Sequence, residues 1–244
     1  PPGADAAVLR IKGTSKGIAL AADTNGRYCW LDPFQGGAIA VAEAARNLSC
    51  LGARPLALTN CLNFGNPEKP AVYYQLEQCI RGMAEACRAL GVPVISGNVS
   101  LYNESEAGAV YPTPLVGMVG LLEDIGRRCT PAFKAAGDVA YVVGVETLDQ
   151  ETATLGGSEY LERVHGRVAG APRIVLEQEA QVQALVREAI GQELLQSAHD
   201  LSDGGLAVAV AESCIWGGLG LRGEAHRLAG RVDAALFGEG QSRV

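Results

Sequence analysis

Short apolar segments alternate with long helical patterns over the first half of the chain, and this alternation most constrains the fold. Residues 38–50 are alanine-rich with apolar positions at helical spacing, and Gly52 follows this predicted helix. Residues 73–90 form a second amphipathic pattern that ends at Gly91. The remaining pattern predicts strands at residues 8–11, 17–22, 55–59, 92–96 and 115–122, a turn at 13–16, and loops at 33–37 and 60–69. Strands alternating with helices are typical of an α/β fold.

The pattern changes around Thr130, where we place a boundary between two domains. Pro1-Pro2-Gly3 is an unusual start, and the chain stops soon after Gly240, where another strand is expected. We therefore expect two domains, residues 1–130 and residues 131–244, the second truncated at its end. The second half predicts a strand at 138–145, a glycine-bearing loop at 154–160 that opens a short helix, a polar helix at 178–192 and an apolar helix at 206–215.

Composition excludes several classes of protein. The net charge is −7 and no run is rich in Lys or Arg, which argues against a nucleic-acid partner. No apolar run reaches the ~18 residues of a membrane span. The 7 cysteines include no C-x-x-C pair, and an odd number at irregular spacing is typical of reduced thiols in a cytoplasmic protein.

Four oxygen-bearing side chains are placed where they could converge on a metal ion. Asp23 follows an apolar strand, and Glu43 and Asn47 lie on one face of the first helix. Asp200, ahead of a glycine pair, could add a ligand from the second domain. Magnesium accepts one or two carboxylates together with phosphate oxygens. The alternative is that Asp23 caps a helix and that Glu43 and Asn47 are ordinary surface residues.

Polar segments follow two of the predicted strands. Residues 59–67 carry three asparagines, and loops leaving the carboxyl ends of strands are the usual ligand sites of α/β folds. Asparagine also tolerates left-handed backbone angles, so an elaborate turn is the alternative. In the second segment, Gly97 permits close backbone approach, Asn98 offers a neutral oxygen and Ser100 a hydroxyl.

Paired glycines precede two of the predicted helices, at Gly156-Gly157 and Gly204-Gly205. Free amides there can hold an anion, although such pairs also form plain turns, and neither pair belongs to a Walker A or G-x-G-x-x-G pattern. His199, followed by Asp200, is either a general base or a structural histidine.

Five longer motifs stand out. They are Leu31-Asp32-Pro33 with Gly36-Gly37-Ala38, residues 61–70, residues 96–100, Tyr111-Pro112-Thr113-Pro114, and residues 199–206. Together they resemble the phosphoribosylformylglycinamidine synthase (FGAM synthase) family, specifically the second repeat of subunit II in its small bacterial form, within the AIR synthetase-like superfamily. The resemblance covers nearly the whole chain.

This resemblance implies an N-terminal barrel-forming α/β domain, whose sheet joins that of a partner, followed by a C-terminal α/β domain. It implies an ATP- and Mg²⁺-dependent ligase of purine biosynthesis, which converts formylglycinamide ribonucleotide and ammonia from glutamine to the amidine. The family's catalytic histidine lies in the first repeat, so the fragment is expected to be inactive alone. The implied partners are the first repeat, a glutaminase subunit and a small bridging subunit. We also expect homodimers of the fragment, with no nucleic-acid or membrane partner.

The resemblance also implies roles for particular residues. Asn60 and Gly97 would contact ATP, Asn98 would hold magnesium and Ser100 would contact substrate. The family pattern has aspartate where Asn60 stands, which puts that assignment in doubt. An auxiliary nucleotide and magnesium site in the long form of the family matches Ala22, Asp23, Glu43, Asn47, Asp200 and Ser202.

Two other functions remain open. The chain could be a non-catalytic nucleotide-binding scaffold within the same enzyme. It could instead be another superfamily member, such as an AIR synthetase or a selenophosphate or thiamine-phosphate kinase, although the run Cys61-Leu62-Asn63-Phe64-Gly65 fits the synthase better.

Overall fold

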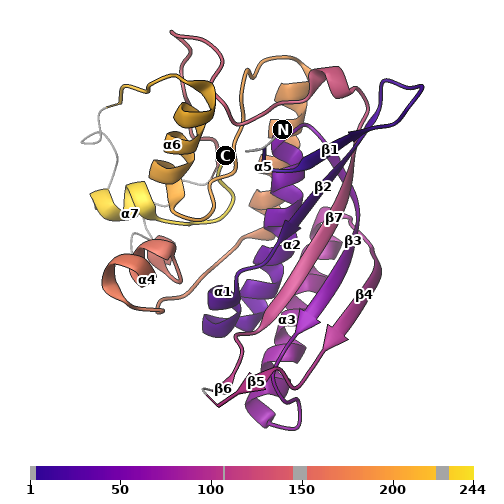
Figure 1. Cartoon of the computed structure of the whole chain (residues 1–244), viewed down its shortest axis with the longest axis vertical. Coiled ribbons are helices and arrows are strands. Elements are labelled where there is room, and N and C mark those ends of the chain that lie inside the picture. The colour runs from indigo at the N-terminus through magenta and orange to yellow at the C-terminus, as the bar shows by residue number, and fades with distance from the viewer. Residues whose placement is uncertain (1–3, 107, 145–152, 224–230) are drawn as a thin grey trace.

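A five-stranded sheet forms the centre of the first half of the chain in the computed structural model, which describes residues 4–106, 108–144, 153–223 and 231–244 (Figure 1). Only β3 and β4 pair in parallel; the other neighbours are antiparallel. The strand order is β1 (Ala7–Arg10), β2 (Gly17–Asp23), β7 (Thr113–Leu122), β3 (Arg54–Asn63) and β4 (Val94–Ser100). A small hairpin, β5 (Glu104–Ser105) and β6 (Gly108–Ala109), lies beside it.

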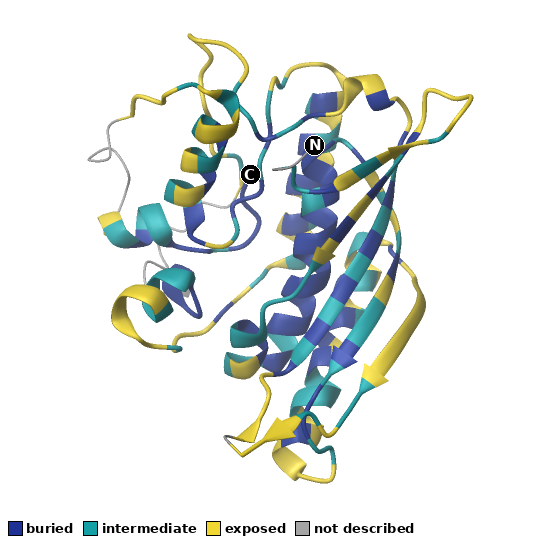
Figure 2. Ribbon diagram, viewed as in Figure 1, coloured by how far each residue is buried: buried dark blue, intermediate teal, exposed yellow. Residues whose placement is uncertain are grey.

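One face of this sheet is covered by helices α1 (Gly26–Leu31), α2 (Pro33–Cys50) and α3 (Pro70–Leu90) (Figures 1 and 2). Residues of β7 alternate strictly between buried and half-buried, as expected when one face packs on a core. Glycines let α2 and α3 approach closely: a Cβ on Gly82 would lie 1.9 Å from the carbonyl oxygen of Phe34. This packing buries nearly all of α2 and fixes the side chains it carries.

The opposite face of the sheet is not covered by any described element (Figure 2). Leu9 of β1 is 58% exposed and Leu20 of β2 is 42% exposed, and both point to this open face. Half-buried apolar residues of β7 continue it across the sheet. An apolar sheet face of this kind is typical of a surface that another part of a protein covers.

The second half of the chain is mainly helical. Helix α5 (Leu176–Gly191) packs against α2, and its Val182, Val186 and Ile190 form a small core with Cys50 and Cys129. The other helices are the one-turn η1 (Ile125–Arg127) and η3 (Ala153–Leu155), α4 (Glu159–His165), α6 (Gly205–Gly217) and α7 (Val232–Phe237). None of the helices in the described ranges has the length and hydropathy that a bilayer crossing requires.

The predicted helices and most strands are confirmed, but the predicted loops are wrong in two places. Residues 33–37 begin α2, because Asp32 accepts a hydrogen bond from the Gln35 amide and Pro33 occupies the first turn. Strand β3 continues to Asn63 and β4 to Ser100, because pairing satisfies their backbone groups despite the polar side chains.

The strand predicted at residues 138–145 is also not formed. Residues 138–144 make only an isolated antiparallel bridge, in which Gly144 pairs with Arg243 near the end of the chain. Pro1, Pro2, Gly3 and Val145 lie outside the described residues.

Candidate functional site

Three of the predicted site residues lie in one row across the covered face of the sheet. Val116 of β7 pairs with Asp23 of β2 on one side and with Asn60 of β3 on the other, and Asn60 pairs with Gly97 of β4. The Asn60 side chain lies directly over Gly97, since a Cβ there would come within 2.0 Å of Asn60 Oδ1. Glycine at position 97 is therefore a steric requirement of Asn60.

Asp23 lies against α2 at one end of this row. Asn47 Nδ2 donates a hydrogen bond of 3.0 Å to Asp23 Oδ2, so the two are brought together as the sequence predicts. Burial and repulsion from Asp200 raise the pKa of Asp23 to about 7. A carboxyl with a raised pKa at a polar junction is a candidate functional group.

An arginine that the sequence reasoning missed holds the other two predicted metal ligands. Arg46 is fully buried, and its guanidinium donates to Asp200 and, at 3.3 Å, to Glu43. It also donates to Glu179 at 2.8 Å and to Gln241 at 3.0 Å. Its position three residues after Glu43 on a helix was the available signal.

A magnesium ion at this place is supported by charge but not by coordination geometry. The carboxylates of Asp23, Glu43, Glu179 and Asp200 surround the Arg46 guanidinium, and the buried Arg243 also interacts electrostatically with Asp200. The buried Asp200 Oδ2 has no hydrogen-bond partner among the described residues. However, the described residues contain no group of three or more His, Cys, Asp or Glu side chains spaced to hold a metal. The four predicted ligands do not form a metal site as they stand, because Arg46 occupies two of them.

The remaining predicted residues lie elsewhere. Asn98 pairs with Cys61 and Ser100 pairs with Asn63. Both lie an odd number of residues from Gly97 along β4, so their side chains face the opposite, open side of the sheet. Ala22 is exposed, also on the open side. Ser202 is half-buried in the segment between Asp200 and α6, where its carbonyl accepts from the Gly205 amide at 2.9 Å.

The two glycine-paired segments do hold an anion, but the anion belongs to the chain itself. Glu239 Oε1 accepts from the Glu159 amide at 2.8 Å and from the Gly204 amide at 2.7 Å. Tyr28, which is buried, donates to Glu239 Oε2 at 2.7 Å. This carboxylate fastens α1 to the starts of α4 and α6.

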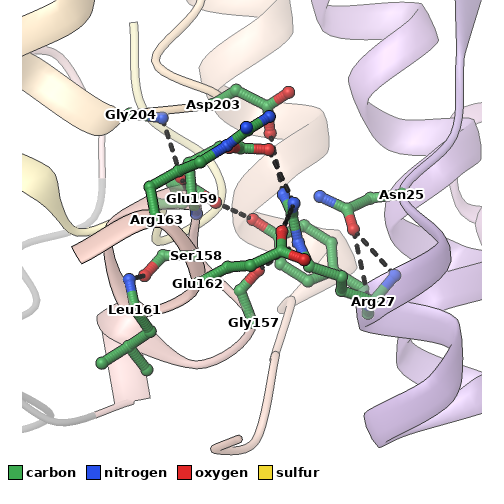
Figure 3. Close-up of polar contacts among 12 residues, drawn as sticks. Asn25, Arg27, Gly157, Ser158, Glu159, Leu161, Glu162, Arg163, Asp203 and Gly204 are labelled. Carbon is green, nitrogen blue, oxygen red and sulfur yellow. Dashed lines mark hydrogen bonds and ion pairs between the residues drawn. The ribbon is translucent and has the colours of Figure 1, made fainter. Parts of the chain in front are cut away.

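Arg27, beside Tyr28 on α1, makes a second connection to the same region (Figure 3). Its Nη1 lies 2.6 Å from Glu159 and 2.5 Å from Glu162, and its Nε donates to the Gly157 carbonyl at 2.9 Å. Asp203 is 3.8 Å from Nη2. Burial alone would lower the pKa of Arg27, but the hydrogen bonds that it donates to Glu159 and Glu162 raise the pKa above its usual range.

His199 is enclosed by acidic groups. Its Nδ1 lies 2.7 Å from Asp5 and its Nε2 lies 2.9 Å from Glu212. Burial alone lowers the pKa of His199, but the two carboxylates raise it to about 9. A histidine that stays protonated at neutral pH is a poor general base, so the structural alternative is favoured.

Comparison with known protein families gives two matches that follow one another along the chain. The model for the N-terminal domain of AIR synthase related proteins matches residues 3–122, and the model for their C-terminal domain matches residues 135–243. The two models together account for most of the sequence. This chain belongs to the AIR synthase related family.

The similar proteins and solved structures point to one kind of enzyme subunit. The chain is 60% identical, over its full length, to phosphoribosylformylglycinamidine synthase subunit PurL of Moorella thermoacetica, and spans 32% of that protein. It also resembles T. maritima PurL complexed with ATP, with a TM-score of 0.58 at 30% identity, covering 79% of this chain and 27% of that one. The structure of T. maritima PurL complexed with FGAR gives a TM-score of 0.59 at 29% identity, covering 79% and 26%.

Proposed function

We propose that this chain supplies one part of an ATP-dependent carbon–nitrogen ligase, the FGAM synthase of purine biosynthesis. The observation that carries this proposal is the 60% sequence identity, over the full length of this chain, to a synthase subunit. Because the chain spans about a third of that relative, the complete reaction requires residues that lie outside it. The similar T. maritima proteins described as complexed with ATP and with FGAR support a nucleotide and a ribonucleotide as the substrates.

In this proposal the two faces of the sheet have different roles: the covered face contacts the nucleotide, and the open face contacts the rest of the enzyme. On the covered face, Gly97 leaves room for the Asn60 side chain, whose amide can hydrogen-bond a nucleotide. On the open face, Asn98 and Ser100 point to where the rest of the enzyme would lie. In the proposed reaction ATP phosphorylates the amide oxygen of the substrate, and ammonia then displaces that phosphate to give the amidine.

Magnesium is part of this proposal through the nucleotide that it accompanies. Asn98 has one neutral oxygen to offer it on the open face. On the covered face Asp23 and Asn47 are the predicted ligands that Arg46 does not engage. Neither set is complete without oxygen atoms from the nucleotide or from other parts of the enzyme.

We also propose that the open sheet face is covered by the first repeat of the same enzyme, and in its absence by a second copy of this chain. Exposed Leu9 and Leu20 support this arrangement, since a contiguous apolar face is costly in water. We place the domain boundary near residue 130, between the two family matches. The glutaminase and bridging subunits stay predictions from the resemblance.

The function can be tested in the complete enzyme that contains this chain. Asn98→Ala and Ser100→Ala should each lower amidine formation at least tenfold, while thermal stability stays unchanged. Asn103→Ala would be a poor control because its amide donates to the Phe64 and Ser100 carbonyls, whereas the exposed Arg88→Ala is suitable. Normal activity in both site variants would contradict the proposal.

The second candidate is a non-catalytic scaffold, and the buried network around Arg46 favours it. This network joins α2 to α5 and to the chain near Gln241, so its first role is to hold the two halves of the chain together. Asp23→Ala would then lower stability without changing the rate per folded enzyme. A lost rate with unchanged stability would instead favour a role in catalysis.

A further inference from the structure

A small pocket lies at the end of β3 opposite to Asn60, far from the row described above. Its volume is about 230 Å³. Arg54 and Pro55 at the start of β3 form one wall, Ala89, Leu90 and Gly91 at the end of α3 form the second, and Ala180, Gln183 and Arg187 of α5 form the third. The pocket is therefore lined by two arginines, and none of its lining residues is acidic.

Neither arginine of this pocket has an ion pair within the described part of the chain. Arg187 is half-buried and its Nη1 donates to the Ser49 hydroxyl at 2.7 Å, but no described carboxylate lies within ion-pair distance. Arg54 likewise has no ion pair among the described residues. Glu123 interacts electrostatically with Arg54, but its carboxylate is ion-paired with Lys16, at 2.7 Å.

The other groups that face the pocket are already engaged. Gln183 donates its amide to the Ala42 carbonyl at 3.1 Å and to Glu179 at 2.7 Å. Glu179 in turn is bound by Arg46 and by the Ser242 hydroxyl. Neither residue can neutralise Arg187, and burial together with the charge of Arg54 lowers the pKa of Arg187 below its usual range.

Capping of helix α3 does not explain the two arginines. Cations near a helix C-terminus are stabilising, by about 0.3–1 kcal/mol. However, two of the last carbonyls of α3 accept from the backbone: Arg88 accepts from Gly91 at 3.3 Å and Cys87 accepts from Val92 at 2.9 Å. Arg54 and Arg187 donate to neither of these carbonyls.

We propose that this pocket binds a phosphate-type dianion, as free phosphate or as the phosphoryl group of a small metabolite. Two guanidinium groups are well suited to it, because each presents parallel N–H donors to a tetrahedral oxyanion. The volume admits a phosphoryl group and a small substituent. Arg54 lies in the segment matched by the N-terminal family model and Arg187 in the segment matched by the C-terminal one. A bound anion would therefore connect these two segments.

Thermal unfolding of the intact chain in phosphate and in chloride of equal ionic strength tests the proposal. Phosphate should raise the melting temperature by about 3 °C at concentrations well above its dissociation constant, and chloride should not. In Arg54→Gln and in Arg187→Gln this phosphate-specific rise should disappear. Arg88→Gln, an exposed arginine of α3 paired with Glu85 at 3.5 Å, should keep it.

A second measurement separates binding from a purely structural role. In phosphate-free buffer Arg54→Gln should be as stable as the parent chain or more stable, since it removes repulsion from Arg187. Calorimetric titration with phosphate and with ribose 5-phosphate distinguishes a free anion from a phosphoryl ester, and each arginine variant should bind at least tenfold more weakly. The proposal is overturned if chloride has the same effect as phosphate, or if the rise persists in both arginine variants.

Discussion

Arg46 on α2 donates to the carboxylate of Asp200, 154 residues later in the chain. This contact is buried, and it places a fixed cation among the acids that the sequence predicts as magnesium ligands. A guanidinium cannot lose its proton in a protein, so Arg46 remains a cation beside these acids at any pH. The network thus stabilises the junction of the two halves whether or not a metal binds nearby.

Removing this cation should be severely destabilising. Arg46→Met leaves Glu43, Glu179 and Asp200 buried without the cation that each contacts, and the free energy of unfolding should fall by about 3 kcal/mol or more. Arg81→Met, which removes an exposed arginine 2.8 Å from Glu77, should cost less than ~1 kcal/mol. Urea unfolding of both variants checks the prediction, and equal losses would show that the network is not important for stability.

Arg46 also gives a sharper test for magnesium. If Arg46 alone supplies the cation that the surrounding acids need, a roughly tenfold change in Mg²⁺ concentration should leave the melting temperature of the parent chain unchanged. Arg46→Gln should become Mg²⁺-sensitive, because the three acids then need another cation. A rise in the parent chain that Asp23→Asn abolishes would favour a metal beside Arg46.

A methyl group at position 97 should disturb Asn60. Gly97→Ala places a Cβ 2.0 Å from Asn60 Oδ1, so the amide must turn away, and nucleotide affinity and stability should both fall. The double variant Asn60→Ala/Gly97→Ala should recover part of the stability, although the Asn60 carbonyl, 2.9 Å from the same position, limits the recovery. Gly191→Ala has open space and serves as the control. Additive effects in the double variant would contradict the contact.

The carboxylate of Glu239 should be coupled to Tyr28. Glu239→Ala leaves the Glu159 and Gly204 amides and the Tyr28 hydroxyl without their acceptor, which should cost about 2–3 kcal/mol. Glu239→Gln keeps one oxygen for the two amides and should cost less. A double-mutant cycle with Tyr28→Phe, followed by urea unfolding, should give a coupling of about 1 kcal/mol. A coupling of zero would mean that the hydroxyl contact contributes nothing.

The sequence predicted the elements better than the boundaries between them. Helices with strong 3.6-residue periodicity and a terminal glycine, such as α3 with Gly91, were confirmed. Asn60 was predicted in a loop because its segment is polar, but pairing of β3 with β7 on one side and β4 on the other keeps it in a strand. Asn98 was placed after the end of its strand, but pairing with β3 extends that strand to Ser100. Strand content around residue 140 was overestimated, since the apolar run there is exposed and makes only one bridge.

The candidate site was predicted in part. The spacing of Glu43 and Asn47 put both on one helical face, and the structure does bring Asn47 to Asp23. The i,i+3 spacing of Glu43 and Arg46 is a local signal for that pair alone. The contacts of Arg46 with Asp200 and of Glu239 with the Gly204 amide have no local signal, because they join segments more than 30 residues apart. Long-range partners of charged side chains depend on packing, which a single sequence does not display.

The ion pairs of His199 should make stability depend on pH. The pKa of His199 in the folded chain is about 9, above its usual ~6.5 when unfolded, so the folded state binds the proton more tightly. This contribution is fully present below pH ~6.5 and is lost as pH rises through about 9. Between pH 6 and pH 10 the parent chain should lose more unfolding free energy than His199→Gln, by up to ~3 kcal/mol.

Glu212→Gln should lower the His199 pKa in NMR titration, because it removes the acid 2.9 Å from Nε2, whereas Glu193→Gln should leave that pKa unchanged. Parallel pH profiles for the parent chain and His199→Gln would show that these pairs add nothing to folding.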